Sequence, residues 1–354
     1  MGKSRLKREN AELLVIGKIY DQELERLLLQ ISRIGVPNSI NTVQINLVRG
    51  MCAHLGNANV KILSTGISGL YPHNCTKAFI AGRNLRLDSQ VRGRFIGYIN
   101  LPIFKEISAT LGIIIHALKW LYNTRKNADT RIVLTYNLYT PILLAIRLLK
   151  VFSPKLSTLL VFGDLAGEYI ATSGRKGLFL HLEKYDYDFQ LRLANKFDAY
   201  GLCTKWMTEA IDCTNKPYCI VEVIVDSSID KNMKAPISSS EFRKVIMYAG
   251  TLKKEYNIDL LLEALSLLKQ QDYELWIYGS GEAEIEREIR KLATQDERIK
   301  FFGYVSKDEI LEAQAKADVF VNPRTNSGVF TKYSFPSKTA EVILSERPLV
   351  CFKL

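Results

Sequence analysis

Short apolar runs alternate with longer segments of helical spacing along most of the chain. The alternation is most regular in the last third. The strands predicted there cover residues 244–250, 273–279, 299–302 and 318–321, and the helices between them cover 258–269, 282–293 and 307–317. Strands that alternate with helices predict a parallel sheet with helices on both faces.

The earlier part of the chain gives the same pattern with longer irregular stretches. Its predicted strands are 12–17, 60–63, 77–87, 131–137, 159–164, 197–203 and 218–225. Its predicted helices are 27–34, 41–51, 102–122, 141–151 and 180–195, with Asn41 as the N-cap of the second. Residues 227–240 have the composition of a linker. A chain of 354 residues fits two α/β domains, which we place at 1–228 and 241–354.

The predicted helix over 102–122 is the most apolar segment. Its apolar part, 107–121, contains His116 and Lys119 and is too short to span a bilayer. We interpret it as a core helix, with a surface helix that touches lipid as the alternative. The N-terminus is basic but lacks the apolar centre of a signal peptide. The six cysteines form no CxxC pair, so the sequence predicts no disulfide framework and no zinc site, and it fits a reducing cytoplasm.

Positive charge is concentrated in the first part of the chain. Residues 1–225 hold 29 Lys and Arg against 17 Asp and Glu, whereas residues 226–354 hold 19 against 20. Between Arg26 and Lys105 there are ten basic residues and a single acid, Asp88. This asymmetry predicts a surface that meets an anionic partner. No nucleic-acid-binding motif is visible, so we expect an anionic membrane surface and no nucleic acid, with a merely soluble basic face as the alternative.

Polar residues end two predicted strands of the first domain. Tyr136 and Asn137 end one strand and Asp164 ends the other, so all three are expected at the sheet edge where α/β domains build their clefts. Asn137 and Asp164 are candidate cleft residues, for which the family resemblance described below implies a catalytic role; a helix N-cap or turn is the alternative role for Asp164. Asp186 and Asp188 form a DxD pair, but they lie in a helical pattern and not after a strand, so we expect no metal there.

The stretch from Ala317 to Leu354 carries the strongest chemical pattern. A strand and a polar loop with Gly328 lead to a predicted helix that starts at Pro336. The start of a helix presents unpaired N–H groups to a phosphate, and Glu341 one turn later can accept hydrogen bonds from a ribose diol. The alternative is an ordinary pair between Glu341 and Lys338 on one helix face.

Residues 331–350, TKYSFPSKTAEVILSERPLV, resemble the donor-site segment of family 4 glycosyltransferases of the GT-B fold, and most closely those that build bacterial capsule and exopolysaccharide. The resemblance implies two Rossmann-like domains with parallel sheets that face each other across a cleft. It extends loosely over the first domain and strongly from Val245 onward. Relatives continue past the strand at Leu349, so the chain is interpreted as C-terminally truncated.

In such enzymes the helix start holds the diphosphate of a nucleotide-sugar and a Glu on the helix holds the ribose, a position that Glu341 matches. The donor-binding residues implied by the resemblance are Gly250, Thr251, Lys253, Lys254, Gly279, Gly281, Tyr304, Val305, Arg324, Lys332, Tyr333, Ser334, Phe335, Pro336, Ser337, Lys338 and Glu341.

This sequence departs from the family pattern at several positions. Tyr333 stands where an earlier Glu is general, Thr251 replaces an Arg, and Gly163 stands where many relatives carry a His before the Asp. We expect Arg324, Lys332 and a lysine of the pair Lys253-Lys254 to supply the missing positive charge.

The resemblance implies a retaining, metal-independent hexosyltransferase without a cofactor. It would move a sugar from a UDP- or GDP-linked donor to a saccharide or lipid-linked acceptor in surface polysaccharide synthesis, in the cytoplasm at the inner face of the membrane. Two alternatives remain: a GT-B sugar-nucleotide epimerase, and an inactive GT-B binding protein.

Overall fold

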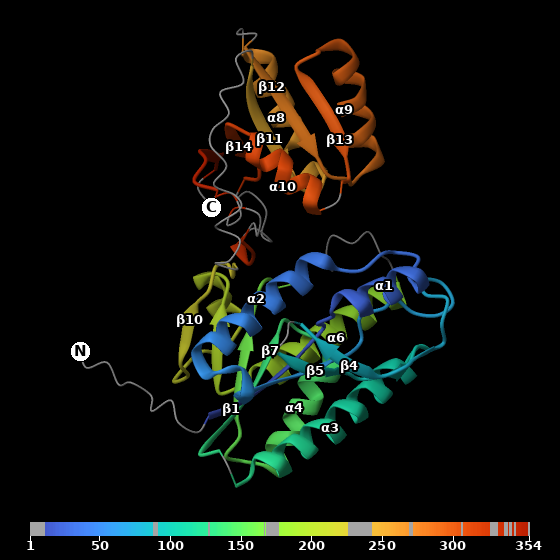
Figure 1. Ribbon diagram of the computed structural model, residues 1–354, viewed down its shortest axis with the longest axis vertical. Helices are drawn as coiled ribbons and strands as arrows, with labels where there is room; N and C mark the ends of the chain where they lie inside the picture. Colours follow the sequence, from blue (N-terminus) through green and yellow to red (C-terminus); the bar gives the residue numbers. More distant parts are fainter. Residues whose placement is uncertain are drawn as a thin grey trace, which may run out of the picture. The chain divides into compact units, whose positions relative to one another are not determined.

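The computed structural model describes residues 11–87, 91–126, 128–165, 167, 177–225, 243–268, 272–305, 307–325, 332–335, 339, 342 and 345–352. The chain divides into two compact units, Met1–Ile224 and Val225–Leu354 (Figure 1). Each unit is an α/β layer structure whose central strands run in parallel, which confirms the predicted fold class.

The first unit is built on an eight-stranded sheet of order β10-β9-β8-β7-β1-β2-β5-β4. Its strands are β1 Ala11–Gly17, β2 Val60–Ser64, β4 Arg83–Arg86, β5 Arg92–Phe95, β7 Thr130–Tyr136, β8 Ser157–Val161, β9 Ala199–Leu202 and β10 Tyr218–Ile220. Only β4 runs antiparallel to its neighbour. A separate antiparallel pair joins β3 Phe79–Ile80 to β6 Tyr98–Ile99.

Helices cover both faces of this sheet. They are α1 Gln22–Ile31, α2 Asn38–Leu55, α3 Phe104–Thr124, α4 Thr140–Phe152 and α6 Leu178–Ala194. Leu47, Val48 and Cys52 of α2 pack on one face against alternate residues of β1 and β2, such as Val15 and Ile62. Helices α3 and α4 lie on the opposite face (Figure 1). None of the described helices is long and apolar enough to cross a membrane.

Three local expectations for the first unit are wrong. The predicted strand 77–87 is two short strands, β3 and β4, and β5 and β6 were missed. Strand β5 escaped detection because it is rich in arginine: Arg92 and Arg94 are exposed on a strand near the sheet edge, while only Phe95 is buried. Charged residues near an edge discourage pairing with other chains. Asn41 is not an N-cap, because α2 begins at Asn38.

The second unit contains a five-stranded parallel sheet of order β13-β12-β11-β14-β15. Its strands are β11 Lys244–Ala249, β12 Tyr273–Tyr278, β13 Ile299–Gly303, β14 Val319–Asn322 and β15 Leu349–Cys351, and its helices are α8 Ile258–Leu267, α9 Ala283–Gln295 and α10 Lys307–Lys316. Helices α8 and α9 share one apolar cluster with the sheet, and α10 packs in a second cluster. The alternation predicted for this part is confirmed.

In both sheets the chain reverses its direction of growth beside the first strand. From β1 the chain adds β2 on one side, and β7 and β8 follow on the other. From β11 it adds β12 and β13 on one side, and β14 and β15 on the other. A ligand crevice forms at such a switch point, outside the carboxyl ends of the strands.

Asn41 makes a buried contact that fixes the loop after β1. Its side-chain oxygen accepts a hydrogen bond from the backbone N–H of Tyr20 at 3.0 Å, and its amide donates to the Tyr20 carbonyl at 3.0 Å. We predict that Asn41→Ala lowers the free energy of unfolding of the first unit by about 1–3 kcal/mol, because a buried peptide group loses both partners. Urea unfolding of the whole protein measures it. Thr42→Ala is the control, since the Thr42 hydroxyl bonds to Asn38 within the same helix. Equal losses in the two variants would contradict the prediction.

Candidate functional site

Asn137 shapes the end of β7 in the first unit. Its backbone is left-handed, with φ of 58°, a conformation that non-glycine residues adopt uncommonly. The side-chain oxygen accepts a hydrogen bond from the Gly163 backbone N–H at 2.6 Å, and the side-chain amide donates to Asp164 Oδ1 at 2.9 Å. One side chain therefore ties the end of β7 to the turn after β8.

Asp164 is partly buried in this turn. Burial raises the pKa of its carboxyl group, and the hydrogen bond from Asn137 opposes that rise. A partly buried carboxylate with a single hydrogen-bond donor can accept a hydrogen bond from a sugar hydroxyl, and it can also accept the proton of that hydroxyl. The structure thus brings together the two residues predicted as catalytic.

The Tyr136 ring leaves no room for a side chain at Gly163. A Cβ atom at position 163 would lie 1.8 Å from the Tyr136 hydroxyl oxygen, so a larger residue fits there only if that ring moves. The Tyr136 ring therefore stands where the side chain of a histidine at position 163 would begin. Burial, followed by the charge of Asp164, raises the pKa of Tyr136, which keeps its hydroxyl protonated at neutral pH.

The DxD pair lies on α6, as the helical pattern predicts. Asp186 accepts hydrogen bonds from Thr140 at 2.6 Å and from Gln190 at 2.6 Å, so it joins α6 to the start of α4. Within the described ranges, no group of three His, Cys, Asp or Glu side chains is placed to hold a metal ion.

The first unit also gathers side chains that sequence reasoning missed. Lys18 directly follows β1, Tyr139 follows β7, and Lys105 lies in the first turn of α3. Lys18 Nζ lies 3.7 Å from the centre of the Tyr139 ring. The available signal was the position of Lys18 at the carboxyl end of a predicted strand, next to the switch point.

The glycine turns of the second unit touch each other. The turn after β11 begins at Gly250, and the turn after β12 runs from Gly279 to Gly281. Leu252 N–H donates to the Ser280 carbonyl at 3.1 Å, and Glu282 N–H donates to the Leu252 carbonyl at 2.8 Å.

Glycine is required where these turns meet. A Cβ at Gly279, whose φ is +130°, would lie 1.8 Å from the Gly250 carbonyl oxygen, and one at Gly281 would lie 1.9 Å from that of Leu252. Side-chain-free backbone at strand ends allows a phosphate to approach closely. The predicted donor glycines are therefore brought together at the carboxyl edge.

Positive and aromatic groups lie along the same edge. Arg324, 8% exposed, follows β14; it donates to the Ser334 hydroxyl at 2.6 Å and its guanidinium lies 5.6 Å from the Tyr256 ring centre. Arg324 thus holds the loop that contains Ser334. Asn257 donates to Thr325 Oγ1 at 3.0 Å and links the turn after β11 to the same strand end.

The remaining predicted donor residues take varied positions. Thr251 and Lys254 are exposed, and Lys253 is partly buried. Tyr304, 76% exposed, and Val305 follow Gly303 at the end of β13. Four predicted donor residues of the last loop are partly buried: Lys332, Tyr333, Ser334 and Phe335. Four others lie outside the described residues: Pro336, Ser337, Lys338 and Glu341. The phosphate and ribose roles of the helix predicted to start at Pro336 therefore stay predictions.

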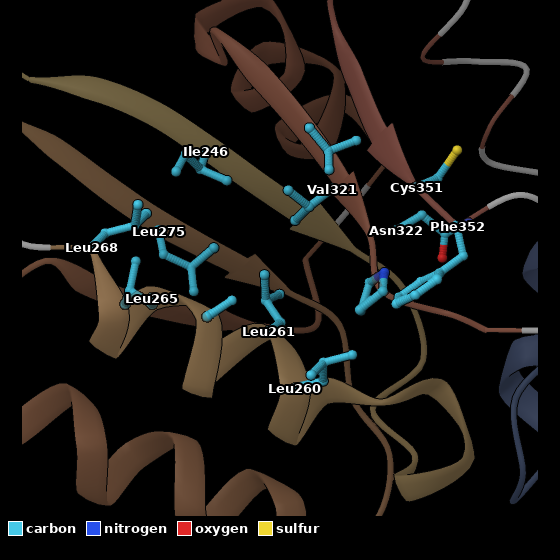
Figure 2. A pocket seen from close by; sticks show the side chains of 13 residues that line it. Ile246, Leu260, Leu261, Leu265, Leu268, Leu275, Val321, Asn322, Cys351 and Phe352 are labelled. Atoms are coloured by element: carbon cyan, nitrogen blue, oxygen red, sulfur yellow. The ribbon is translucent and has the colours of Figure 1, made fainter.

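An apolar pocket of about 490 Å³ lies beside α8 in the second unit (Figure 2). Leu260, Leu261 and Leu265 of α8 face strand residues such as Ile246 and Val321 across it. Asn322 is the polar side chain in a lining that is otherwise apolar. The pocket contains none of the predicted donor residues, so we do not assign the nucleotide to it.

Residues 243–354, which span the described strands of the second unit, match the sequence model of the family described as "Glycosyl transferases group 1". No curated protein is a significant match by sequence. Solved structures match over nearly the whole chain. The apo structure of OtsA has a TM-score of 0.58 at 9% identity and covers 96% of this chain and 83% of its own.

Two further structures match with similar TM-scores and coverage. The apo form of the lipopolysaccharide outer core galactosyltransferase WaaB has a TM-score of 0.54 at 15% identity, covering 96% of this chain and 80% of its own. Anabaena HepE in complex with UDP has a TM-score of 0.55 at 10% identity, with the same coverage of 96% and 80%. The chain has the GT-B fold. Identities this low establish the fold and leave the activity to be argued from the site.

The contact between Asn137 and Asp164 gives a testable pKa. Asn137→Gly keeps the left-handed backbone, which suits glycine, and removes the amide donor. Because that hydrogen bond lowers the pKa of Asp164, its loss is predicted to raise the pKa further. Carbon-13 NMR titration of the aspartate carboxyl groups measures it. Asp198 is the internal control, since its lowered pKa depends on Lys150 and Thr158. An unchanged or lower pKa at Asp164 would contradict the prediction.

Proposed function

We propose that the protein is a glycosyltransferase that moves a sugar from a nucleotide-sugar donor to a saccharide acceptor. The observation that carries the proposal is the match of residues 243–354 to a glycosyl transferase family, on a unit whose glycine turns meet at the carboxyl edge of the sheet. The GT-B fold of the whole chain supports it.

The donor half of the site is assigned to the second unit. Lys253 and Lys254, in the turn that follows Gly250, would hold the diphosphate together with Lys332, and Glu341 would hold the ribose. Arg324 contributes by fixing the loop at Ser334. HepE, which shares the fold, was solved with UDP and with UDP-glucose, and this favours a uridine nucleotide over a GDP-linked donor.

The acceptor half is assigned to the first unit. Asp164 would accept a hydrogen bond from the reacting hydroxyl of the acceptor, with Asn137 holding the carboxylate in place. The donor's leaving diphosphate would be stabilised by backbone N–H groups and lysines, so the proposed reaction uses no metal and no cofactor. Retention of configuration and a hexose as the transferred sugar belong to the proposal as well.

The proposed pathway is surface polysaccharide synthesis, of the capsule or exopolysaccharide type, with a lipid-linked acceptor. WaaB, one of the similar structures, is described as a lipopolysaccharide outer core galactosyltransferase. An epimerase and an inactive binding protein are the competing functions. Turnover assays with UDP-sugars and saccharide acceptors separate them: transfer of the sugar supports the proposal, epimerised donor supports the first alternative, and nucleotide binding without turnover supports the second.

Nucleotide binding gives the sharpest early test. Isothermal titration calorimetry is expected to show UDP binding that Glu341→Gln weakens by about 1–3 kcal/mol through lost ribose hydrogen bonds. Lys254→Ala should weaken UDP far more than uridine, because uridine has no phosphates. Gly281→Ala should abolish tight UDP binding, since the new Cβ would push the two turns apart. The matched control is Gly50→Ala, where a Cβ meets nothing within 4 Å. Wild-type affinity in all three variants would disprove the donor site.

Membrane attachment is proposed through α3. Its outer side exposes Phe104, Ile107, Leu111 and Ile115 at helical spacing, while Ile113 and its neighbours on the other side are buried in the unit. The expected core helix therefore has a second apolar side. Two further apolar residues, Phe79 and Ile99, are exposed and lie opposite each other in the paired strands β3 and β6.

Basic residues accompany this apolar surface. Lys77 is exposed next to β3, and the hairpin of β4 and β5 exposes Arg86, Arg92 and Arg94. An apolar helix side with nearby basic residues suits the interface of an anionic bilayer, where each basic residue adds about 1 kcal/mol.

Vesicle co-sedimentation tests this attachment. The protein is expected to bind vesicles that contain anionic lipid and to release them as salt rises, because charges are screened within about 10 Å at 0.1 M. Leu111→Glu should reduce the bound fraction severalfold, since it places a carboxylate in the apolar surface. Leu267→Glu, at a leucine on α8 of the second unit that is more exposed than Leu111, should not reduce the bound fraction. Equal binding to neutral vesicles, or equal loss in both variants, would rule out the assignment.

A further inference from the structure

Two lysines meet at the switch point of the first unit without an ion pair. Lys18 follows β1, and Lys105 lies in the first turn of α3. Lys105 is 7% exposed and its ammonium donates to the Ser68 carbonyl at 2.5 Å. Among the described residues neither lysine has a carboxylate within ion-pair distance. Buried charges of this kind are costly when no opposite charge accompanies them.

The surroundings hold these ammonium groups in place. Lys18 Nζ lies 3.7 Å from the ring centre of Tyr139, and Lys105 Nζ lies 5.5 Å from that of Tyr98. An aromatic face attracts a cation and fixes its position without neutralising it. A Cβ at Gly66 would lie 2.5 Å from the Tyr139 hydroxyl, so the turn after β2 is glycine where that ring needs space.

Polar groups that could meet a ligand complete the cluster. The Tyr139 hydroxyl is buried, and its burial, followed by the charge of the neighbouring Glu106 carboxylate, raises the pKa of this hydroxyl. Ser68 and Tyr98 share a hydrogen bond between their hydroxyls at 2.8 Å. The acid that acts on both lysines is Glu106, which is exposed. Two ammonium groups against one carboxylate leave a net positive charge.

The electrostatics agree with this geometry. Removal from water, followed by the charge of Lys105, lowers the pKa of Lys18 to about 8, and Glu106 opposes the shift. Burial likewise lowers the pKa of Lys105. Both lysines are held in a setting that penalises their charge, and an anion placed between them would relieve that penalty.

We propose that Lys18 and Lys105 form an anion subsite in the first unit that binds a carboxylate or phosphate group of the sugar acceptor. The proposal rests on the glycosyltransferase function proposed above. Strands in a sheet are spaced about 4.8 Å apart, so the end of β1 lies two strands, about 10 Å, from the end of β8 and Asp164. The anionic group would therefore sit to one side of the reacting hydroxyl and select for acidic sugars.

Calorimetry on the full chain tests the subsite with three sugars: glucose, glucuronate and glucose 6-phosphate. Wild-type protein is expected to bind an acidic sugar at least about tenfold more tightly than glucose, as charge-assisted hydrogen bonds imply. Lys18→Gln and Lys105→Gln should remove the preference, and Lys18→Arg should keep it. Lys155→Gln, at an exposed lysine of the same unit, also removes one positive charge, and this variant should still prefer the acidic sugar. Lys18 is only partly buried, so its variants keep the test valid even if Lys105→Gln does not fold.

The outcomes separate the possible sources and functions. Preference for glucuronate alone identifies a carboxylate, and preference for the sugar phosphate alone identifies a phosphate. Equal affinity for all three sugars, or equal loss in Lys155→Gln, overturns the subsite. If Lys18→Gln weakens UDP as much as the acidic sugar, the lysine serves the donor and the proposal is wrong. If UDP fails to bind while the acidic preference persists, the subsite stands and the proposed glycosyl transfer fails.

Discussion

Strand β1 pairs in parallel with both of its neighbours, and this pairing decides which side chains of the first unit meet. Gly17 lies opposite Ser64 of β2, and Ile16 lies opposite Thr135 of β7, so the three strands end at one level. The residues that follow each strand are then delivered to one edge, whatever their distance in sequence. The second unit repeats the arrangement, with β11 between β12 and β14.

Each edge is finished by close contacts between backbone segments or side chains. In the second unit, glycine turns approach until no Cβ fits between them, and Asn257 and Arg324 tie the adjacent strand ends. In the first unit a side chain links the strand ends instead: Asn137, in a left-handed conformation, forms hydrogen bonds that connect the end of β7 to the turn after β8. Strain of this kind persists where the surroundings hold it, and such positions occur at functional sites.

The positively charged residues of the first unit fall into groups with different surroundings. Lys18 and Lys105 lie at the switch point of the first unit, whereas the hairpin of β4 and β5 exposes Arg86, Arg92 and Arg94. The ten basic residues between Arg26 and Lys105 thus belong to at least two surfaces with different chemistry. A buried ammonium suits a single bound anion, because desolvation strengthens each interaction, whereas exposed arginines act collectively and are screened by salt.

The sequence by itself determined the α/β class, the order of most strands and helices, and the positions of Asn137, Asp164 and the donor glycines at strand ends, because hydrophobic periodicity and turn residues are local signals. It could not find β5 or β6, whose arginines and short lengths give no periodicity, and it gave Asn41 a capping role. Only the tertiary structure brought Lys18 to Tyr139 and placed Tyr136 against Gly163. Such contacts depend on which strands pair and on how closely their backbones approach, and neither is encoded in the spacing of residues along the chain.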